Sequence, residues 1–181
     1  MSYIERTMKS EKVYEGKVLN LRIDTVELPD KKYSKREIVE HPGAVCIVPI
    51  TSDNKIYLVN QYRKSIDKEI LELPAGKIEI GEEPKECAIR ELKEETGLTA
   101  NKYEYMTEFY TSPGFCNEKI HLFFARELEE GIATPDIDEY IDVKTYSLDE
   151  LLHMIQIGEI SDGKTIIGIQ MINATFASKN E

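Results

Sequence analysis

Three glutamates crowd the end of one predicted helix, at Glu91, Glu94 and Glu95. Their i, i+3 and i+4 spacing puts the three side chains on one side of the helix. Repulsion between Glu91 and Glu95 costs roughly 0.2–0.5 kcal/mol, and the negative end of the helix dipole disfavours each carboxylate by about 0.3–1 kcal/mol. A solvated acidic face would explain an isolated pattern of this kind. Here, however, Glu82 can approach the same point from the preceding loop, and four carboxylates around one point require a cation.

The residue types around these carboxylates favour a hard divalent cation. Oxygen ligands without histidine or cysteine suit Mg²⁺, with Mn²⁺ as the alternative, rather than Zn²⁺. The three histidines form no HExxH pair, and the three widely spaced cysteines fit neither a zinc site nor a disulfide framework. Arg90 lies four residues before Glu94, so its guanidinium can hold one carboxylate. We therefore expect a magnesium site, and reduced thiols that are typical of the cytoplasm.

The helix that carries the carboxylates is predicted over residues 84–96. Pro84 suits a first helical turn, where its missing N–H has no cost, and Gly97 suits the position just after the last turn. Three apolar residues share another side of this helix and are expected to face the core: Ala88, Ile89 and Leu92.

Segments rich in β-forming residues make up much of the remaining chain. They are predicted as strands over residues 17–28, 34–40, 44–50, 55–63, 103–111, 119–128 and 140–146. Turn residues join the first two segments, and Ser52-Asp53-Asn54 predicts a hairpin between the next two. A second helix is expected after Ser147, with Glu150 completing a capping box, and a third over about 162–176. Strands and helices do not alternate regularly, so we predict an α+β fold with helices packed on a mixed sheet.

Length and composition restrict the class of protein further. The 181 residues suit one core domain, and 41% apolar with 31% charged residues is typical of a globular protein. A formal net charge of −11 argues against nucleic acid and against anionic membranes as partners. No apolar run approaches the roughly 20 residues of a membrane span, and the charged N-terminus lacks a signal-peptide core.

The segment GKIEIGEEPKECAIRELKEETGL, residues 76–98, resembles the Nudix box at every fixed position. The order of the surrounding strands and helices is also similar to the Nudix fold, so the resemblance spans most of the chain. It implies an α/β/α sandwich with a mixed sheet, and hydrolysis of a nucleoside diphosphate linked to another moiety. It also implies a Nudix domain over residues 43–181, preceded by a β extension at 1–42 through which relatives form homodimers.

Carried over by position, the resemblance makes Glu91 and Glu95 the principal metal ligands. Glu94 becomes a further ligand or a base, and Glu82 supports the cluster, in some relatives through water. The resemblance also implies that the backbone carbonyl of Ala75 is a metal ligand.

The resemblance also implies how protons and charge are managed. Arg90 orients the glutamates by ion pairing. The catalytic base comes from a loop before the last strand, here TPDIDEYIDV at 134–143. Glu139 is the candidate base, with Asp136 and Asp138 as rivals, and an ordinary acidic surface loop is the alternative explanation of this segment.

Two further segments resemble the ADP-ribose pyrophosphatase branch of the family. They are ELPAGKIE at 72–79 and SPGFCNE at 112–118, whose Pro113 lies sixteen residues after Gly97. The segment QYR, which ends at Arg63, also matches this branch. The implied substrate-contacting residues are Arg63, Pro113, Gly114 and Glu118, with Arg36 reaching the substrate of a partner subunit. A surface salt bridge is the alternative explanation of Arg63, and an ordinary turn proline is the alternative for Pro113.

The reaction implied is hydrolysis of ADP-ribose to AMP and ribose 5-phosphate with Mg²⁺. Another substrate, such as GDP-mannose or NADH, would use the same chemistry, and the Pro113 spacing argues against it. A non-catalytic sensor of ADP-ribose is a third hypothesis. Such domains often lose glutamates of the box and carry a DNA-binding extension, whereas this chain keeps every glutamate and has no basic extension.

Overall fold

The computed structural model describes residues 3–135, 137 and 139–177, which contain ten strands and three helices. The strands are β1 (Arg6–Glu15), β2 (Asn20–Glu27), β3 (Tyr33–Glu40), β4 (Ala44–Pro49), β5 (Lys55–Arg63), β6 (Lys68–Glu72), β7 (Ala75–Lys77), β8 (Thr99–Tyr110), β9 (Lys119–Glu129) and β10 (Ile141–Ser147). The helices are α1 (Pro84–Thr96), α2 (Leu148–Gln156) and α3 (Gly163–Ala177). The chain forms two compact units, the first of Met1–Gly43 with Phe109–Lys119 and the second of Ala44–Glu108 with Ile120–Glu181.

The first unit is an antiparallel sheet in the order β1-β2-β3. The pairing of β2 with β3 confirms the predicted strand pair, whereas β1 was not predicted. All ten β1 residues are exposed, so this strand has no buried side to produce an alternating pattern. The segment 109–119 joins this unit through β3, because the Val39 N–H donates to the Phe115 carbonyl at 2.8 Å and the Asn117 N–H donates to the Val39 carbonyl at 3.1 Å.

The second unit contains two sheets, in the orders β10-β5-β6 and β7-β4-β9-β8. The four-stranded sheet is mixed, because β4 pairs antiparallel with β7 and parallel with β9. The predicted hairpin of residues 44–50 with 55–63 is wrong, because these two strands do not pair with each other along their length. Beyond a single bridge between Ile50 and Ile56, β4 and β5 enter different sheets. The turn signal at residues 52–54 therefore reports a chain reversal and not a strand pair.

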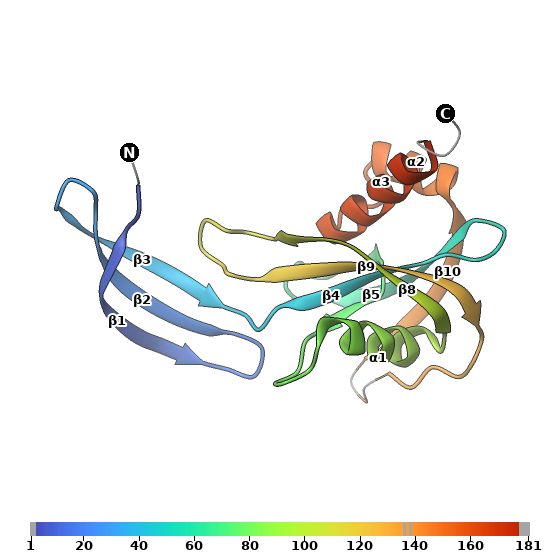
Figure 1. Ribbon diagram of the computed structural model, residues 1–181. Helices are drawn as coiled ribbons and strands as arrows, with labels where there is room; N and C mark the ends of the chain where they lie inside the picture. The colour runs from blue at the N-terminus through green and yellow to red at the C-terminus, as the bar shows by residue number, and fades with distance from the viewer. Residues whose placement is uncertain (1–2, 136, 138, 178–181) are drawn as a thin grey trace. The chain divides into compact units, whose positions relative to one another are not determined.

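Helices cover both faces of the sheets in the second unit, with α1 on one face and α2 and α3 on the other (Figure 1). This is the predicted α/β/α sandwich. The core beneath α1 is a cluster of fully or almost fully buried residues: Val45, Ile47, Cys87, Ala88, Leu92, Leu98, Phe123 and Ala125. On the opposite face α3 approaches closely at Gly168, where a Cβ atom would meet side-chain atoms of Leu73 and Val48. No helix among the described residues is long and apolar enough to cross a membrane.

The predicted ends of two helices are confirmed. Pro84 begins α1, and Gly97 follows it with φ of 74° while donating its N–H to the Lys93 carbonyl at 2.9 Å. Ser147 and Glu150 form the predicted capping box of α2, in which the Ser147 N–H donates to Glu150 Oε2 at 2.8 Å.

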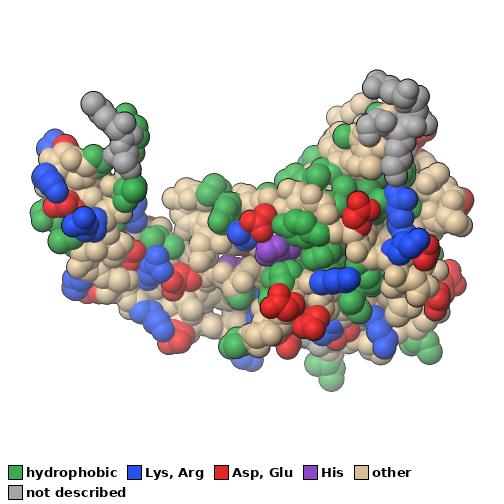
Figure 2. All heavy atoms as spheres, in the orientation of Figure 1, with side chains coloured by type: hydrophobic (Ala, Val, Ile, Leu, Met, Phe, Trp, Pro, Cys, Tyr) green, Lys and Arg blue, Asp and Glu red, His purple; other side chains and the backbone are tan. Residues whose placement is uncertain are grey.

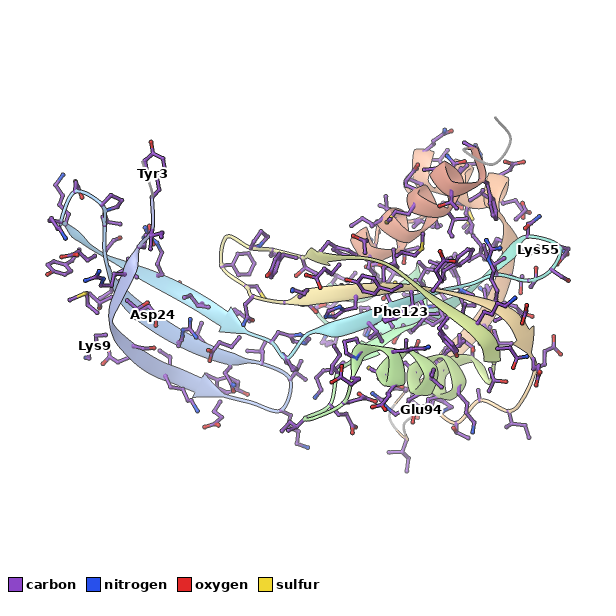
Figure 3. All side chains as sticks on the ribbon, viewed as in Figure 1. Tyr3, Lys9, Asp24, Lys55, Glu94 and Phe123 are labelled. Carbon is purple, nitrogen blue, oxygen red and sulfur yellow. The ribbon has the colours of Figure 1, made fainter. Side chains whose placement is uncertain are left out.

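The predicted core face of α1 needs one correction. Ile89 is 42% exposed, and Cys87 takes its place in the core beside Ala88 and Leu92. The inward face of α1 is therefore centred closer to Glu91 and Glu95 than the apolar pattern indicated. Glu94 projects from the side of α1 that faces away from Phe123 and the sheet (Figure 3).

Candidate functional site

The Arg90 guanidinium is the centre of the carboxylate cluster. Its Nε donates to Glu82 Oε1 at 2.8 Å, and its Nη2 donates to Glu82 Oε2 at 3.0 Å. Its Nη1 donates both to Glu91 Oε1 at 2.7 Å and to Glu94 Oε2 at 2.9 Å. These bonds, first of all those to Glu82, raise the pKa of Arg90 above its ordinary value. Three of the four predicted carboxylates thus share one cation, as expected for Arg90 from the sequence.

Glu82 is the carboxylate that Arg90 stabilises most strongly. Hydrogen bonds from Arg90 lower the pKa of Glu82 to about 2, and the Glu79 N–H also donates to its Oε2 at 3.0 Å. The turn that presents Glu82 uses Gly81 at φ of 83°, in the left-handed region that favours glycine. Glu82 is therefore ionised and fixed beside the first half of α1.

Glu95 is the most deeply buried carboxylate of the cluster, at 4% exposure. Its Oε2 accepts the Ala75 N–H at 2.9 Å, which joins α1 to the start of β7. Burial raises the pKa of Glu95 to about 8, and the nearby charges of Glu91 and Glu139 add to this shift. Within the cluster, Glu95 lacks the compensating positive charge that Arg90 gives to the other three carboxylates.

Glu91 lies against β7, where only a glycine leaves room for it. A Cβ atom at Gly76 would overlap the carboxylate carbon and both carboxylate oxygens of Glu91. Burial raises the pKa of Glu91, as do the charges of Glu94 and Glu139, although Arg90 acts in the opposite direction. Gly76 therefore permits close approach of a carboxylate to the strand.

The donor set fits a hard divalent cation. Within the residues that the structure describes, no three acidic, histidine or cysteine side chains are already arranged around one point for a metal ion. The carboxylates are instead arranged around the Arg90 guanidinium. Burial and mutual repulsion nevertheless disfavour the ionised forms of Glu91 and Glu95. An ion held by oxygen ligands at these two residues would supply the missing positive charge.

Arg63 forms a two-point ion pair, the alternative that the sequence left open for this residue, with a buried partner that the sequence did not identify. Its Nε donates to Glu72 Oε1 at 2.7 Å, and its Nη2 donates to Glu72 Oε2 at 3.0 Å. Glu72 is 1% exposed and also accepts a hydrogen bond from Lys164 Nζ. Sequence reasoning missed Glu72 and Lys164. A glutamate inside the apolar run ILELPAG was a signal for the first, but Lys164 lies 92 residues away.

Glu139 lies in the loop before β10 and is exposed. Its charge contributes to the raised pKa of both Glu91 and Glu95, so its carboxylate acts electrostatically on the same cluster. The rival candidates Asp136 and Asp138 lie outside the described residues.

The remaining predicted site residues belong to the first unit. Glu118 accepts a hydrogen bond from Thr111 Oγ1 at 2.8 Å, and its Oε1 lies 3.6 Å from His41 Nδ1. Pro113 and Gly114 lie in the turn that precedes it. Arg36 pairs with Glu5, through Nε to Oε2 at 2.9 Å and Nη2 to Oε1 at 2.5 Å. The structure thus brings the box residues and Arg63 together in the second unit, and places this other set in the first. In the space-filling view, acidic side chains are exposed on the side of the second unit that carries α1 (Figure 2).

Comparisons with known proteins show which family model, relatives and fold this chain matches. The model of the NUDIX domain family matches residues 40–166. The chain is 47% identical to the methanol dehydrogenase activator of Bacillus methanolicus, over 98% of this chain and 97% of that protein. It is 46% identical to the ADP-ribose pyrophosphatase of Bacillus subtilis (strain 168), over 93% and 92% of the two chains. A crystal structure of an ADP compounds hydrolase has the same fold, with a TM-score of 0.86 at 21% identity, covering 99% of this chain and 98% of that one.

Proposed function

The chain belongs to the NUDIX family, and from this we propose that it hydrolyses ADP-ribose to AMP and ribose 5-phosphate with Mg²⁺ or Mn²⁺. One observation carries the proposal. Glu82, Glu91 and Glu94 share the Arg90 guanidinium, and Glu95 lies buried close to Glu91 with a raised pKa that the more distant charge of Arg63 only partly offsets. The similarity to an ADP-ribose pyrophosphatase over nearly the whole chain supports ADP-ribose as the substrate.

The residues that would hold the metal are Glu91, Glu95 and the carbonyl of Ala75, with Glu82 supporting them. A divalent ion held there would neutralise charge on the diphosphate and would make the attacking water easier to deprotonate. Arg90 keeps Glu82 and Glu94 in place through its hydrogen bonds.

The chain's other groups handle the proton and the substrate. Glu139 takes the proton of the water that attacks one phosphorus atom of the diphosphate. The bond from that phosphorus to the bridging oxygen breaks, and the bridging oxygen leaves as part of the other phosphate. Arg63 contacts a phosphate or the terminal ribose, because Nη1 makes no hydrogen bond within the described residues while Nε and Nη2 are held by Glu72. Glu118, with Pro113 and Gly114 before it, contacts the ribose.

Residues 1–42 are proposed to be the dimerisation extension of a Nudix domain that covers 43–181. Exposed apolar side chains on and beside β1 support this role: Ile4, Met8, Val13 and Tyr14. In the dimer, Arg36 would break its ion pair with Glu5 and would contact the substrate bound by the partner subunit. Light scattering of the purified protein, before and after removal of residues 1–42, tests the dimer.

A substrate panel with Mg²⁺ tests the proposed reaction. ADP-ribose, GDP-mannose and NADH are incubated with the protein, and phosphate is measured after phosphatase treatment. We expect the highest kcat/KM with ADP-ribose. A higher value with GDP-mannose or NADH would reject the substrate but keep the chemistry, and binding of ADP-ribose without products would indicate a sensor domain.

The 47% identity to a methanol dehydrogenase activator favours a second candidate function, activation of a methanol dehydrogenase. The two identities are too similar to separate this function from ADP-ribose hydrolysis. Methanol oxidation by a methanol dehydrogenase, measured with wild-type protein, with Glu95→Gln and with neither, tests it. An equal rate in all three reactions would reject this function.

A further inference from the structure

A line of alternating charges runs from Arg63 to the start of α3. Glu72 lies between the Arg63 guanidinium and Lys164 Nζ, and Lys164 also donates to Asp162 Oδ2 at 3.0 Å. The side chains of Glu72, Lys164 and Asp162 are 1%, 13% and 17% exposed. Such pairs are strong only when their hydrogen bonds are satisfied, because the charges are removed from water.

The first turn of α3 also holds the backbone next to Glu72. The Leu73 N–H donates to Thr165 Oγ1 at 2.8 Å, and this hydroxyl donates in turn to Asp162 Oδ2 at 2.6 Å. The Thr165 N–H donates to the same carboxylate oxygen at 3.0 Å. Asp162 therefore orders one helical turn, and this turn contacts two consecutive residues of the segment from Glu72 to Ala75. It contacts the side chain of Glu72 and the backbone of Leu73.

The same segment continues directly into the carboxylate cluster. The Pro74 carbonyl accepts the Ile47 N–H at 2.9 Å, and the Ala75 N–H donates to Glu95 at 2.9 Å. Each residue from Glu72 to Ala75 thus has at least one hydrogen-bond partner outside this segment. The position of α3 is therefore imposed on a segment that ends at the candidate metal site.

Lys164 lies where it can fix the orientation of Arg63 through Glu72, and it is not positioned to contact a substrate directly. Its ammonium is directed to two carboxylates, Glu72 and Asp162, and little of it reaches solvent. Arg63 is 39% exposed, so its guanidinium depends on Glu72 for a fixed orientation. Glu72 in turn has one anchor besides Arg63 in the described residues, which is Lys164.

We propose that Lys164 is a positioning residue that acts through Glu72 to hold the Arg63 guanidinium in its binding orientation. The inference rests on the proposed function, in which Arg63 contacts the substrate. It assigns to α3 a part in substrate binding that the sequence pattern of the box does not include. A purely structural role, in which Lys164 only neutralises a buried carboxylate, is the alternative.

Steady-state kinetics of Lys164→Met test the proposal, with Lys164→Arg as the conservative variant. We expect KM for ADP-ribose to rise about 10-fold or more, the lower end of effects seen for supporting residues, while kcat falls less than about threefold. Lys164→Arg should restore KM to within about threefold of wild type. The control is Lys55→Met, which removes the same charge from an exposed pair with Asp53 and should leave both parameters unchanged.

A double-mutant cycle separates positioning from structural support. In an Arg63→Met background, Lys164→Met should change KM by less than about twofold, because its target is gone. An equal effect of Lys164→Met with and without Arg63 would overturn the proposal. Where Lys164→Met does not fold, as judged by thermal unfolding, Lys164→Gln enters the same cycle, since it keeps a hydrogen-bond donor without the charge.

A readout that needs no activity keeps this test independent of the proposed function. The side-chain Nε–H of Arg63, assigned by NMR through the Arg63→Met variant, should exchange slowly with water because Glu72 accepts it. We expect Lys164→Met to accelerate this exchange and Lys164→Arg to preserve it. Unchanged exchange in Lys164→Met refutes the positioning role, whereas failure of wild type to hydrolyse ADP-ribose refutes the proposed function alone.

Discussion

Gly76→Ala should separate activity from stability more sharply than any other single change in the box. The added methyl group would overlap the carboxylate of Glu91, and this carboxylate can leave only by breaking its 2.7 Å bond to Arg90. Gly76 has no positive φ, so an alanine there has no backbone strain of its own. The effect of the substitution is therefore confined to one contact between a strand and a helix.

The size of the effect follows from this contact. Ordinary van der Waals contact with a Cβ atom requires 3.4–4 Å, so Glu91 must move by a distance on the order of 1 Å. A displacement of that size in a reacting group can reduce the rate about 100-fold, or roughly 2.7 kcal/mol. The free energy of unfolding should change less, because the end of the flexible Glu91 side chain can move away. Alanine also restricts the unfolded chain more than glycine does, which stabilises the folded protein by about 0.4–1 kcal/mol.

The assay compares Mg²⁺ titrations of ADP-ribose hydrolysis with urea unfolding of the same preparations. Gly76→Ala should need more Mg²⁺ and have a kcat/KM about 100-fold lower, with unfolding free energy within about 1 kcal/mol of wild type. Gly163→Ala is the matched control, since a Cβ atom there meets nothing within 4 Å. If Gly76→Ala keeps kcat/KM within about threefold of wild type, the close approach of Glu91 to β7 has no catalytic importance.

Three further predictions use the same cluster and its supporting ion pairs. Glu139→Gln should lower kcat about 100-fold or more and still bind Mg²⁺, whereas Glu95→Gln should lose both activity and Mg²⁺ binding. A near-wild-type kcat for Glu139→Gln would exclude Glu139 as the base. Chelation by EDTA should abolish hydrolysis without unfolding the protein, and Mg²⁺ or Mn²⁺ should restore it; activity that survives chelation would reject the metal. Glu72 should make the protein sensitive to acid. Burial raises the pKa of Glu72, but Arg63 and Lys164 together lower it by more than burial raises it, so the net pKa lies below the ordinary 4.5. The stability from this depressed pKa is present above 4.5 and lost as pH falls through the lower folded-state value, so Glu72→Gln should flatten the acid side of the urea-unfolding profile.

The sequence predicted those parts of the site whose partners lie within one helix or one turn. Arg90 and Glu94 are neighbours on α1, and the spacing alone indicated their ion pair. Arg63, Glu72 and Lys164 come from β5, β6 and α3, so no local pattern joins them. The same limit explains the hairpin error, because a turn signal shows that the chain reverses and does not show which strands pair afterwards.

The misplaced core face of α1 has a physical cause in the site itself. An ordinary amphipathic helix would have apolar residues at the positions of Glu91 and Glu95. The apolar pattern of such a helix would predict its buried side correctly. Here two carboxylates occupy the inward side, which shifts the apparent apolar side towards Ile89. The error and the site therefore share one origin, since function places charge where packing alone would place a hydrocarbon.

Arg90 compensates only part of the charge that α1 brings into this inward side. With all four carboxylates ionised, the Arg90 guanidinium would leave an excess of three negative charges. Arg90 makes no hydrogen bond to Glu95 within the described residues, and the charge of Arg63 lowers the pKa of Glu95 only in part. Burial and repulsion therefore fall on Glu91 and Glu95, whose pKa values are raised while that of Glu82 is lowered. A second arginine hydrogen-bonded directly to Glu95 would relieve this excess permanently and would remove the attraction for a divalent ion. Arg90 thus holds Glu82, Glu91 and Glu94, but the pKa values of Glu91 and Glu95 remain raised. We therefore expect an exchangeable divalent ion at these two carboxylates, where it would also bind the phosphates of a substrate.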